Sequence, residues 1–208
     1  MSSPDFFYEQ ARANIERTLI KGRVSKADVF ITRIDQHRCV VKDYAQKGFW
    51  ERNLIGRIVI GREARAYMAL SDIEGLPKRF QRLSPFSFAV EFLEGRDFGS
   101  VGGEEIGGDQ IGQLERIVQS LHERGWVHLD LHRRANILLS GGRVYLIDFA
   151  SAMHTGLIPI LGRVFTALIG IADLLSIIKM KTIYCPDSMS SRERFWLHVR
   201  NAVMPSKW

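Results

Sequence analysis

The stretch Trp126-Val-His-Leu-Asp-Leu-His-Arg-Arg-Ala-Asn136 carries several side chains capable of chemistry, and the short motif Leu146-Ile-Asp-Phe149 follows it. Residues 136–139 and 144–147 are two short apolar segments, and Ser140-Gly-Gly-Arg143 joins them. A Gly-Gly pair between two apolar segments is typical of a two-residue hairpin turn. We therefore predict a pair of strands, with polar groups beside their ends.

Three of these polar groups are Asp130, Asn136 and Asp148, and each lies next to one of the short apolar segments. Taken singly, an aspartate beside a strand could be an ordinary turn residue. Together, two carboxylates and an amide form a set of hard oxygen ligands. Such a set suits Mg²⁺, which takes one or two carboxylates and completes its shell with substrate phosphates and water.

The order of these parts resembles the catalytic loop and metal-binding aspartate of protein-kinase-like phosphotransferases, whose pattern is H-x-D, a downstream Asn, and then D-F-G after a strand pair. This chain has Ala150 in place of that glycine. The resemblance implies that Asp130 orients the acceptor hydroxyl and accepts its proton, and that Asn136 and Asp148 bind Mg²⁺. His128 belongs to the same catalytic group, where the resemblance implies a hydrogen-bonded scaffold more than an acid or base. Asp173 is expected to accept hydrogen bonds from the backbone of this loop.

The resemblance extends upstream and covers residues from about 22 to 150. It implies that Lys42, at the end of a β-rich segment, clamps the phosphates of ATP, and that Glu63 holds Lys42 in an ion pair. Glu91 and Leu93 fall where such enzymes bind adenine through backbone groups. Ser25 and Lys26 belong to the expected phosphate-binding loop.

Within the superfamily, the chain is most similar to bacterial lipopolysaccharide kinases and RIO-type kinases. Ser25-Lys-Ala-Asp-Val-Phe30 resembles the RIO-type phosphate loop, the chain ends 60 residues after Asp148, and no Ala-Pro-Glu occurs in that remainder. We therefore expect no activation segment and no peptide-docking platform. The resemblance implies a small or lipid-linked hydroxyl acceptor, such as an inner-core sugar of lipopolysaccharide.

The loop also departs from the family pattern at several positions. Asn136 follows Asp130 by six residues instead of the usual five, so one residue must bulge for Asn136 to reach the metal. His132 stands where protein kinases carry a lysine, which leaves Arg133 and Arg134 as cationic alternatives. Two other functions therefore stay open: a RIO-like protein kinase or ATPase, and a pseudokinase that serves as an interaction module.

The predicted fold is a two-lobed α+β protein-kinase-like fold: a β-rich N-lobe with one main helix at 1–94, a glycine-rich hinge at 95–112, and a reduced, mostly helical C-lobe at 113–208. In the N-lobe, apolar residues at four-residue spacing, Phe7, Ala11, Ile15 and Leu19, predict a helix that stops near Gly22. Strands are predicted at 28–34, 38–42 and 86–92. A helix is predicted at 56–70, with Ile60, Ala64, Tyr67 and Met68 on one side. Further helices are predicted at 111–121, within 162–181 and after the capping box Ser190-Ser-Arg-Glu193.

The composition, with 46% apolar and 25% charged residues and a net charge of +6, is that of a globular, mildly basic protein. Such a charge favours anionic partners such as nucleotides, but the excess is spread along the chain, so no nucleic-acid partner is expected. Two distant cysteines and an N-terminus without a secretory pattern favour the cytoplasm. Residues 157–180 are read either as a core helix or, near 156–161, as a membrane-surface element. The second alternative implies peripheral contact with the inner face of the cytoplasmic membrane.

Overall fold

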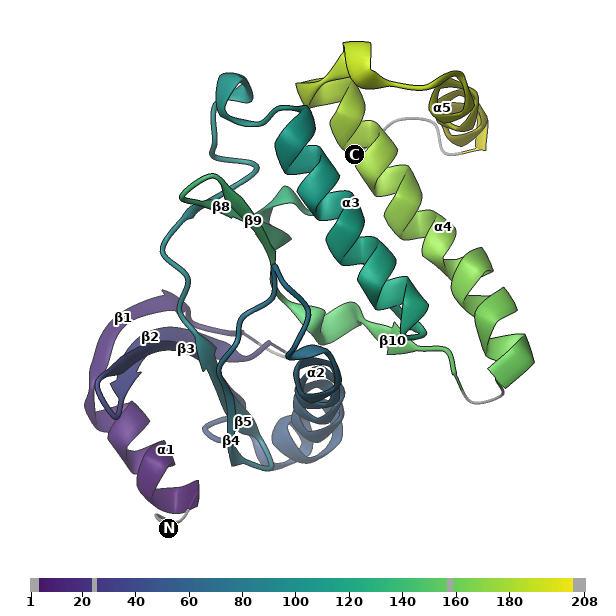
Figure 1. Ribbon diagram of the computed structural model, residues 1–208. Coiled ribbons are helices and arrows are strands. Elements are labelled where there is room, and N and C mark those ends of the chain that lie inside the picture. The colour runs from purple at the N-terminus through teal and green to yellow at the C-terminus, as the bar shows by residue number, and fades with distance from the viewer. Residues whose placement is uncertain (1–3, 24–25, 157–158, 204–208) are drawn as a thin grey trace. The chain divides into compact units, whose positions relative to one another are not determined.

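The computed structural model describes residues 4–23, 26–156 and 159–203. The chain divides into two compact units (Figure 1). Unit 1 contains Met1–Asp72 and Pro77–Leu93, and unit 2 contains Ile73–Leu76 and Glu94–Trp208. Unit 1 is rich in strands and unit 2 is mostly helical, as predicted.

Unit 1 is built on an antiparallel sheet with the strand order β1-β2-β3-β5-β4. The predicted hairpin at 28–42 is confirmed, and Asp35 and Gln36 at its turn both have positive φ, which matches the right-handed twist of the flanking strands. The sequence pattern did not predict β4, because the polar residues Gln81 and Arg82 interrupt its apolar character. The strands are β1 Ile15–Ile20, β2 Asp28–Ile34, β3 His37–Asp43, β4 Phe80–Ser84 and β5 Ser87–Glu91.

The first helix, α1, spans Pro4–Ala13, so the prediction that it continues to Gly22 was wrong. Residues 15–20 form β1 instead, and Ile15 pairs with Thr32 on β2. The Thr32 hydroxyl is buried 2.7 Å from the carbonyl oxygen of Ala11 and 2.9 Å from that of Asn14. This hydroxyl gives a carbonyl of the last helical turn a hydrogen-bond partner from outside the helix. The sequence pattern missed it, because four-residue spacing carries no information about a distant capping side chain.

The main helix of unit 1 begins as a π-helical turn, η1 Glu51–Gly56, and continues as α2 Arg57–Leu70. Gly56 lies against Tyr44, where an added Cβ would approach the Tyr44 Cβ to 2.7 Å. Ile60, Ala64 and Tyr67 are buried as predicted, but Met68 is 67% exposed and was wrongly assigned to the buried side. Met68 points outward because the packing of Gly56 and Tyr67 fixes the rotation of the helix about its axis.

Among its described residues, unit 2 contains three helices and two small sheets, β6-β8-β9 and β10-β7. The predicted hairpin is confirmed as β8 and β9, with positive φ at Gly141 and Gly142. The helices are α3 Gly108–Glu123, α4 Pro159–Tyr184 and α5 Ser191–Val203. The strands are β6 Arg96–Asp97, β7 Trp126–Val127, β8 Ile137–Ser140, β9 Arg143–Leu146 and β10 Met153–His154. Short 3₁₀ turns are η2 Gly103–Glu105, η3 Arg134–Asn136, η4 Phe149–Ser151 and η5 Pro186–Ser188.

The helices α3 and α4 run side by side in Figure 1, and Lys181 ties them to α5. Its Nζ lies 2.6 Å from a carboxylate oxygen of Glu115 on α3 and 2.6 Å from one of Glu193 on α5. The predicted capping box is confirmed, since Glu193 accepts from the backbone N–H of Ser190 at 2.7 Å. One partly buried cation therefore bridges three helices.

The glycine-rich segment at 95–112, which we predicted to be a hinge, is built into unit 2. Strand β6 pairs with β8, and Phe98 and Ile106 are buried. At Gly95, an added Cβ would lie 2.5 Å from the carbonyl oxygen of Leu139. Glycine here permits close packing of backbone on backbone, a use that composition alone does not distinguish from flexibility.

The apolar region at 157–180 belongs largely to α4. Asp173, Ile177 and Met180 are buried, which agrees with the core-helix alternative for this part. The membrane-surface alternative near 156–161 concerns mostly residues that lie outside those described, or whose side chains do. Among the described residues, no helix combines the length and the apolar character needed to cross a bilayer.

The contact between Thr32 and α1 predicts a cost for removing one hydroxyl. Thr32→Val keeps the shape but removes the hydroxyl that donates to the Ala11 carbonyl, so the free energy of unfolding should fall by about 1–3 kcal/mol. Urea denaturation measures this value. Thr18→Val on the exposed strand β1 is the matched control and should change it by less than about 0.5 kcal/mol. An equal loss in both variants would contradict this account of how α1 ends.

Candidate active site

Unit 1 contains the predicted ion pair between Lys42 and Glu63. Lys42 lies on β3, paired in register with Val29 and Phe88, and Glu63 lies on α2. The Nζ of Lys42 is 2.7 Å from Oε1 of Glu63, whose side chain is fully buried. A buried carboxylate requires such a partner. The pair therefore holds the lysine amine at a defined place above the sheet.

The expected phosphate loop is anchored at its base in unit 1. The backbone N–H of Gly22 donates to Asp28 Oδ1 at 2.9 Å, and Lys47 Nζ donates to the same oxygen at 2.8 Å and to the Gly22 carbonyl at 2.7 Å. Sequence reasoning missed both Asp28 and Lys47. Ser25 lies outside the described residues, whereas Lys26 is described and exposed.

Glu91 and Leu93 lie at the end of unit 1. The backbone N–H of Glu91 donates to the carbonyl of Arg79 at 2.9 Å, and its side chain accepts from the backbone N–H of Lys78 at 2.7 Å. Leu93 is half-buried and is the last residue of the unit. Both the backbone N–H and the side chain of Glu91 thus fasten β5 to the chain before β4.

In unit 2, Asp130 and Asn136 are joined directly. The Nδ2 of Asn136 donates to the carbonyl of Asp130 at 3.0 Å and to its Oδ2 at 3.1 Å. Both partners are acceptors, so the amide nitrogen must face Asp130. The amide oxygen of Asn136 is therefore turned away from Asp130, and oxygen is the atom through which an amide binds Mg²⁺.

The extra loop residue between Asp130 and Asn136 is absorbed by the turn η3. The N–H of Arg133 donates to the carbonyl of Asp130 at 3.3 Å, and the N–H of Asn136 donates to that of Arg133 at 2.9 Å. The Asn136 carbonyl in turn accepts from Ile147 N–H at 2.9 Å, one residue before Asp148. The longer loop thus brings Asn136 to Asp130, as the predicted bulge required.

Nitrogen atoms of two side chains face the Asp130 carboxylate. Nε of Arg133 lies 3.2 Å and Nδ1 of His132 lies 3.4 Å from its Oδ1. Arg134 instead donates to the hydroxyl of Tyr184 at 3.1 Å. Of the two predicted arginine alternatives, Arg133 is the one beside the carboxylate.

Asp148 has a left-handed backbone conformation, with φ of 65° and ψ of 79°. Its Oδ1 accepts from the backbone N–H of Ala150 at 3.2 Å. Such a conformation is costly for a residue with a side chain and persists only where its surroundings enforce it. The following Phe149 is buried, and its ring meets that of His128 edge to face at 5.0 Å between centroids.

His128 is fully buried and serves as a scaffold. Its Nδ1 accepts from the backbone N–H of Asp130 at 3.3 Å, which requires the proton on Nε2, 3.2 Å from the carbonyl of Ile147. Burial lowers the pKa of His128, against the opposing effect of the Asp173 carboxylate. The ring of His128 thus links Ile147, the residue before Asp148, to Asp130.

The predicted contact of Asp173 with the loop is confirmed. Its two carboxylate oxygens accept from the backbone N–H groups of His128 and Leu129, each at 2.8 Å. Sequence reasoning missed His122, whose Nε2 lies 3.1 Å from Asp173 Oδ2. No pattern links residues 122 and 173, because the contact depends on the packing of α3 against α4.

Comparison with known proteins places the fold. No protein-family model and no curated protein matches the chain. Two solved structures of Rio2 kinase from Chaetomium thermophilum do match it in three dimensions. One, a complex with ADP, Mg²⁺ and phosphoaspartate, has a TM-score of 0.61 and 15% identity over 90% of this chain and 61% of that one. The other has a TM-score of 0.60 and 13% identity over 85% and 60%.

These likenesses show that the chain has the predicted protein-kinase-like fold. The chain spans about three fifths of the length of the two Rio2 kinase chains it matches. At such low identity, the likeness concerns the fold. What the protein does must be argued from its own side chains.

The lowered pKa of His128 predicts a pH-dependent stability. The unfolded chain binds a proton at this histidine near pH 6.5, whereas the folded chain keeps it neutral, so stability is complete above that pH and falls in acid. Between about pH 7.5 and about pH 5.5, the free energy of unfolding should fall by up to about 1.4 kcal/mol more in the wild type than in His128→Gln.

Urea denaturation of both proteins at the two pH values checks this difference. The other histidines are common to both chains and cancel in the comparison. Equal acid sensitivity of the two proteins would show that His128 titrates alike in the folded and unfolded states.

Proposed function

We propose that the protein is an ATP-dependent, Mg²⁺-requiring phosphotransferase that moves the γ-phosphate of ATP to a hydroxyl group. The observation that carries the proposal is the pair of hydrogen bonds from Asn136 to Asp130. The additional residue in the loop had left open whether Asn136 could come this close to Asp130. An amide held in this way presents its oxygen, together with the Asp148 carboxylate, as a ligand set of the kind Mg²⁺ prefers. A kinase-like fold supports the same conclusion.

Each polar group then has a distinct role. Lys42, positioned by its ion pair with Glu63, binds the phosphates of the nucleotide. Asp130 orients the acceptor hydroxyl and accepts its proton. Bound Mg²⁺ would neutralise the charge on the phosphates, with Asn136 and Asp148 as its protein ligands. His128 holds the loop and takes no part in proton transfer, because it is fully buried and backbone groups occupy both its ring nitrogens.

The nucleotide requires further contacts from unit 1. The backbone of Glu91 and Leu93 would bind adenine, and Ser25 and Lys26 would cover the phosphates. The anchoring of Gly22 by Asp28 and Lys47 supports this assignment, because a phosphate loop needs a fixed base.

The acceptor proposed is an inner-core sugar of lipopolysaccharide or a similar lipid-linked hydroxyl compound. Support comes from the short path between Asp148 and α4, which holds only η4 and the two-residue strand β10 among its described residues. So short a path offers little surface for docking a peptide. This acceptor implies a cytoplasmic protein that acts at the inner face of the cytoplasmic membrane.

A second candidate is a RIO-like ATPase or protein kinase. It is favoured by the matched Rio2 complex, which contains a phosphoaspartate. In such a reaction, a carboxylate oxygen bonds to the γ-phosphorus and ADP leaves. Water then cleaves the acyl phosphate to phosphate and free carboxylate. A pseudokinase module is the remaining alternative, and it would bind nucleotide without turnover or not at all.

Removal of the base tests the proposal. With radiolabelled ATP, Mg²⁺ and a panel that includes lipopolysaccharide inner-core fragments, Asp130→Asn should lower the turnover number by about 10²- to 10⁴-fold. Its nucleotide affinity should stay within about threefold of the wild-type value, because Asp130 acts on the acceptor. Asp187→Asn, an exposed aspartate in η5, is the matched control and should keep full activity.

Undiminished transfer by Asp130→Asn would contradict the assignment. Label that stays on the protein and is released by hydroxylamine would favour the phosphoaspartate route instead. Nucleotide binding by the wild type without transfer to any acceptor or to water would favour the pseudokinase.

A further inference from the structure

The main helix of unit 1 exposes a row of large apolar side chains. Phe49 is 62% exposed, Trp50 72%, Leu54 57% and Ile58 65%. We call these four residues the Trp50 stripe. Single exposed apolar residues are common on protein surfaces, but a contiguous group that includes two aromatic rings marks a binding surface.

The exposure of the stripe is fixed by how the helix packs. Trp50, Leu54 and Ile58 recur at four-residue intervals and so follow one side of η1–α2. The opposite side is held in place, because Gly56 lies against Tyr44 and Ile60 is fully buried. The helix therefore cannot rotate to bury the stripe without losing these contacts.

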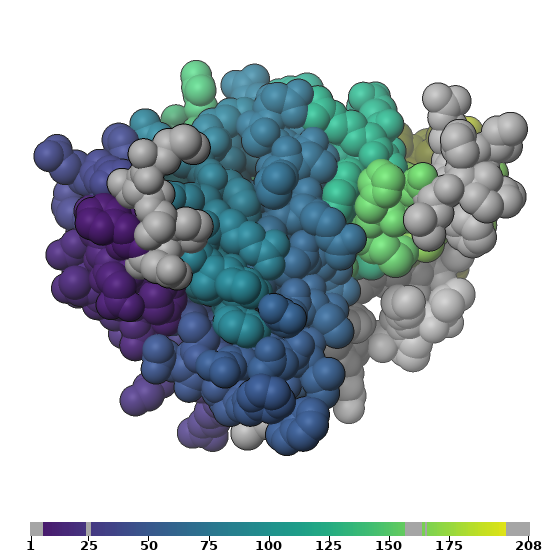
Figure 2. All heavy atoms as spheres, turned by 90° about the horizontal axis from the view of Figure 1, so that it is seen from below, coloured from purple at the N-terminus to yellow at the C-terminus, as the bar shows by residue number. Residues whose placement is uncertain are grey.

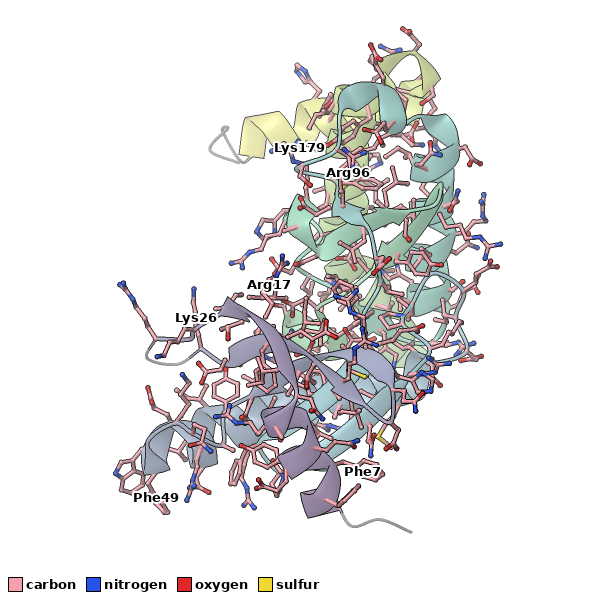
Figure 3. All side chains as sticks on the ribbon, turned by 90° about the vertical axis from the view of Figure 1, so that its left-hand side faces the viewer. Phe7, Arg17, Lys26, Phe49, Arg96 and Lys179 are labelled. Carbon is pink, nitrogen blue, oxygen red and sulfur yellow. The ribbon has the colours of Figure 1, made fainter. Side chains whose placement is uncertain are left out.

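The outer position of the stripe is visible in two views. Figure 3 shows Phe49 near the outer end of this helix, with its ring directed away from the sheet of unit 1. Figure 2 shows the blue atoms of this part of the chain at the surface of unit 1. The rings of Phe49 and Trp50 meet edge to face, with centroids 5.4 Å apart, so they form one aromatic group.

Cationic side chains accompany the stripe. Arg57 and Arg65 are exposed on the same helix, and residues 47–65 contain five basic residues against two acidic ones, one of which, Glu63, is paired with Lys42. Lys47 also joins this helix to the phosphate loop through the Gly22 carbonyl. That loop adds exposed cations, among them Lys26, whose side chain also points outward in Figure 3.

We infer that the Trp50 stripe and its flanking arginines form a docking surface for an anionic phospholipid bilayer. A helix with aromatic and aliphatic residues on its outer side and arginines beside them lies in the membrane interface, with rings at the headgroup level and cations at the lipid phosphates. Each anionic headgroup near a surface cation adds to the attraction. The surface is separate from the segment at 156–161 that the sequence had suggested for membrane contact.

Charge favours a bilayer over a second copy of this chain as the occupant. A twofold interface would place the same patch on itself, so Arg57 and Arg65 of one copy would meet those of the other. Like charges brought together in this way oppose association. An anionic lipid surface has the complementary charge and accepts the rings without a shaped recess.

The inference does not depend on the proposed phosphotransfer, because binding is measured without ATP or acceptor. The experiment is co-sedimentation of the full chain with vesicles of phosphatidylcholine, with or without about one third phosphatidylglycerol. The wild type should sediment with the anionic vesicles, and less so as salt rises. Combined Trp50→Gln, Leu54→Gln and Ile58→Gln should lower the partition coefficient at least about tenfold.

Two further variants separate the contributions. Arg57→Gln with Arg65→Gln should weaken binding to anionic vesicles and leave the weak binding to phosphatidylcholine unchanged. Phe195→Gln with Trp196→Gln removes an exposed aromatic pair from α5 of unit 2 and is the matched control, which should bind as the wild type does. Circular dichroism of all variants should be unchanged, because every replaced side chain is exposed.

Three results would overturn the inference. The first is equal vesicle binding by the wild type and the Trp50-stripe variant. The second is loss of binding in the α5 variant alone. The third is a wild type that is dimeric without lipid, together with a Trp50-stripe variant that is monomeric. The last would identify a second copy of the chain as the occupant. Failure of this experiment would leave the Asp130 assay untouched, so the two proposals can fall separately.

Discussion

The carboxylate of Asp173 is fully buried in unit 2, and two consecutive backbone N–H groups, those of His128 and Leu129, donate to it. Leu129 has a positive φ of 65°, a conformation that costs a non-glycine residue roughly 1–3 kcal/mol. Hydrogen bonds to a buried carboxylate are strong enough to offset that cost. His122 on α3 contacts the same carboxylate, and Gly170 on α4 leaves room for the His122 ring. The backbone before Asp130 is therefore held by α4, and the positions of Asp130 and Asn136 depend on it.

In unit 1, an ion pair positions the functional side chain. Glu63 is buried on α2, and its ion pair with Lys42 positions the lysine amine. In both units a buried carboxylate from a helix fixes a functional group on a strand or loop. Phosphoryl transfer needs positioning and charge neutralisation more than covalent chemistry, so side chains fixed in this way suit the proposed reaction. The membrane surface proposed on η1–α2 would bring the same unit to a lipid-linked acceptor.

The sequence predicted the functional elements better than the boundaries of the scaffold. The β8–β9 hairpin, the Lys42–Glu63 pair and the contact of Asp173 with the loop follow from short motifs whose chemistry restricts the residue types. The end of α1, the strand β4 and the exposed Met68 were missed. They depend on tertiary contacts, such as that of Thr32 with the last turn of α1, which overrode the local spacing. Composition likewise cannot show that Gly95 serves close packing of backbone against Leu139.

The proposed phosphotransfer requires Asn136 and Asp148 to hold the divalent ion of a bound nucleotide. A crystal structure with Mn²⁺ and a non-hydrolysable ATP analogue tests it most directly, because the anomalous signal of Mn²⁺ locates the metal. We expect Mn²⁺ coordinated by the Asn136 amide oxygen and the Asp148 carboxylate. Metal bound away from both residues would contradict the proposal.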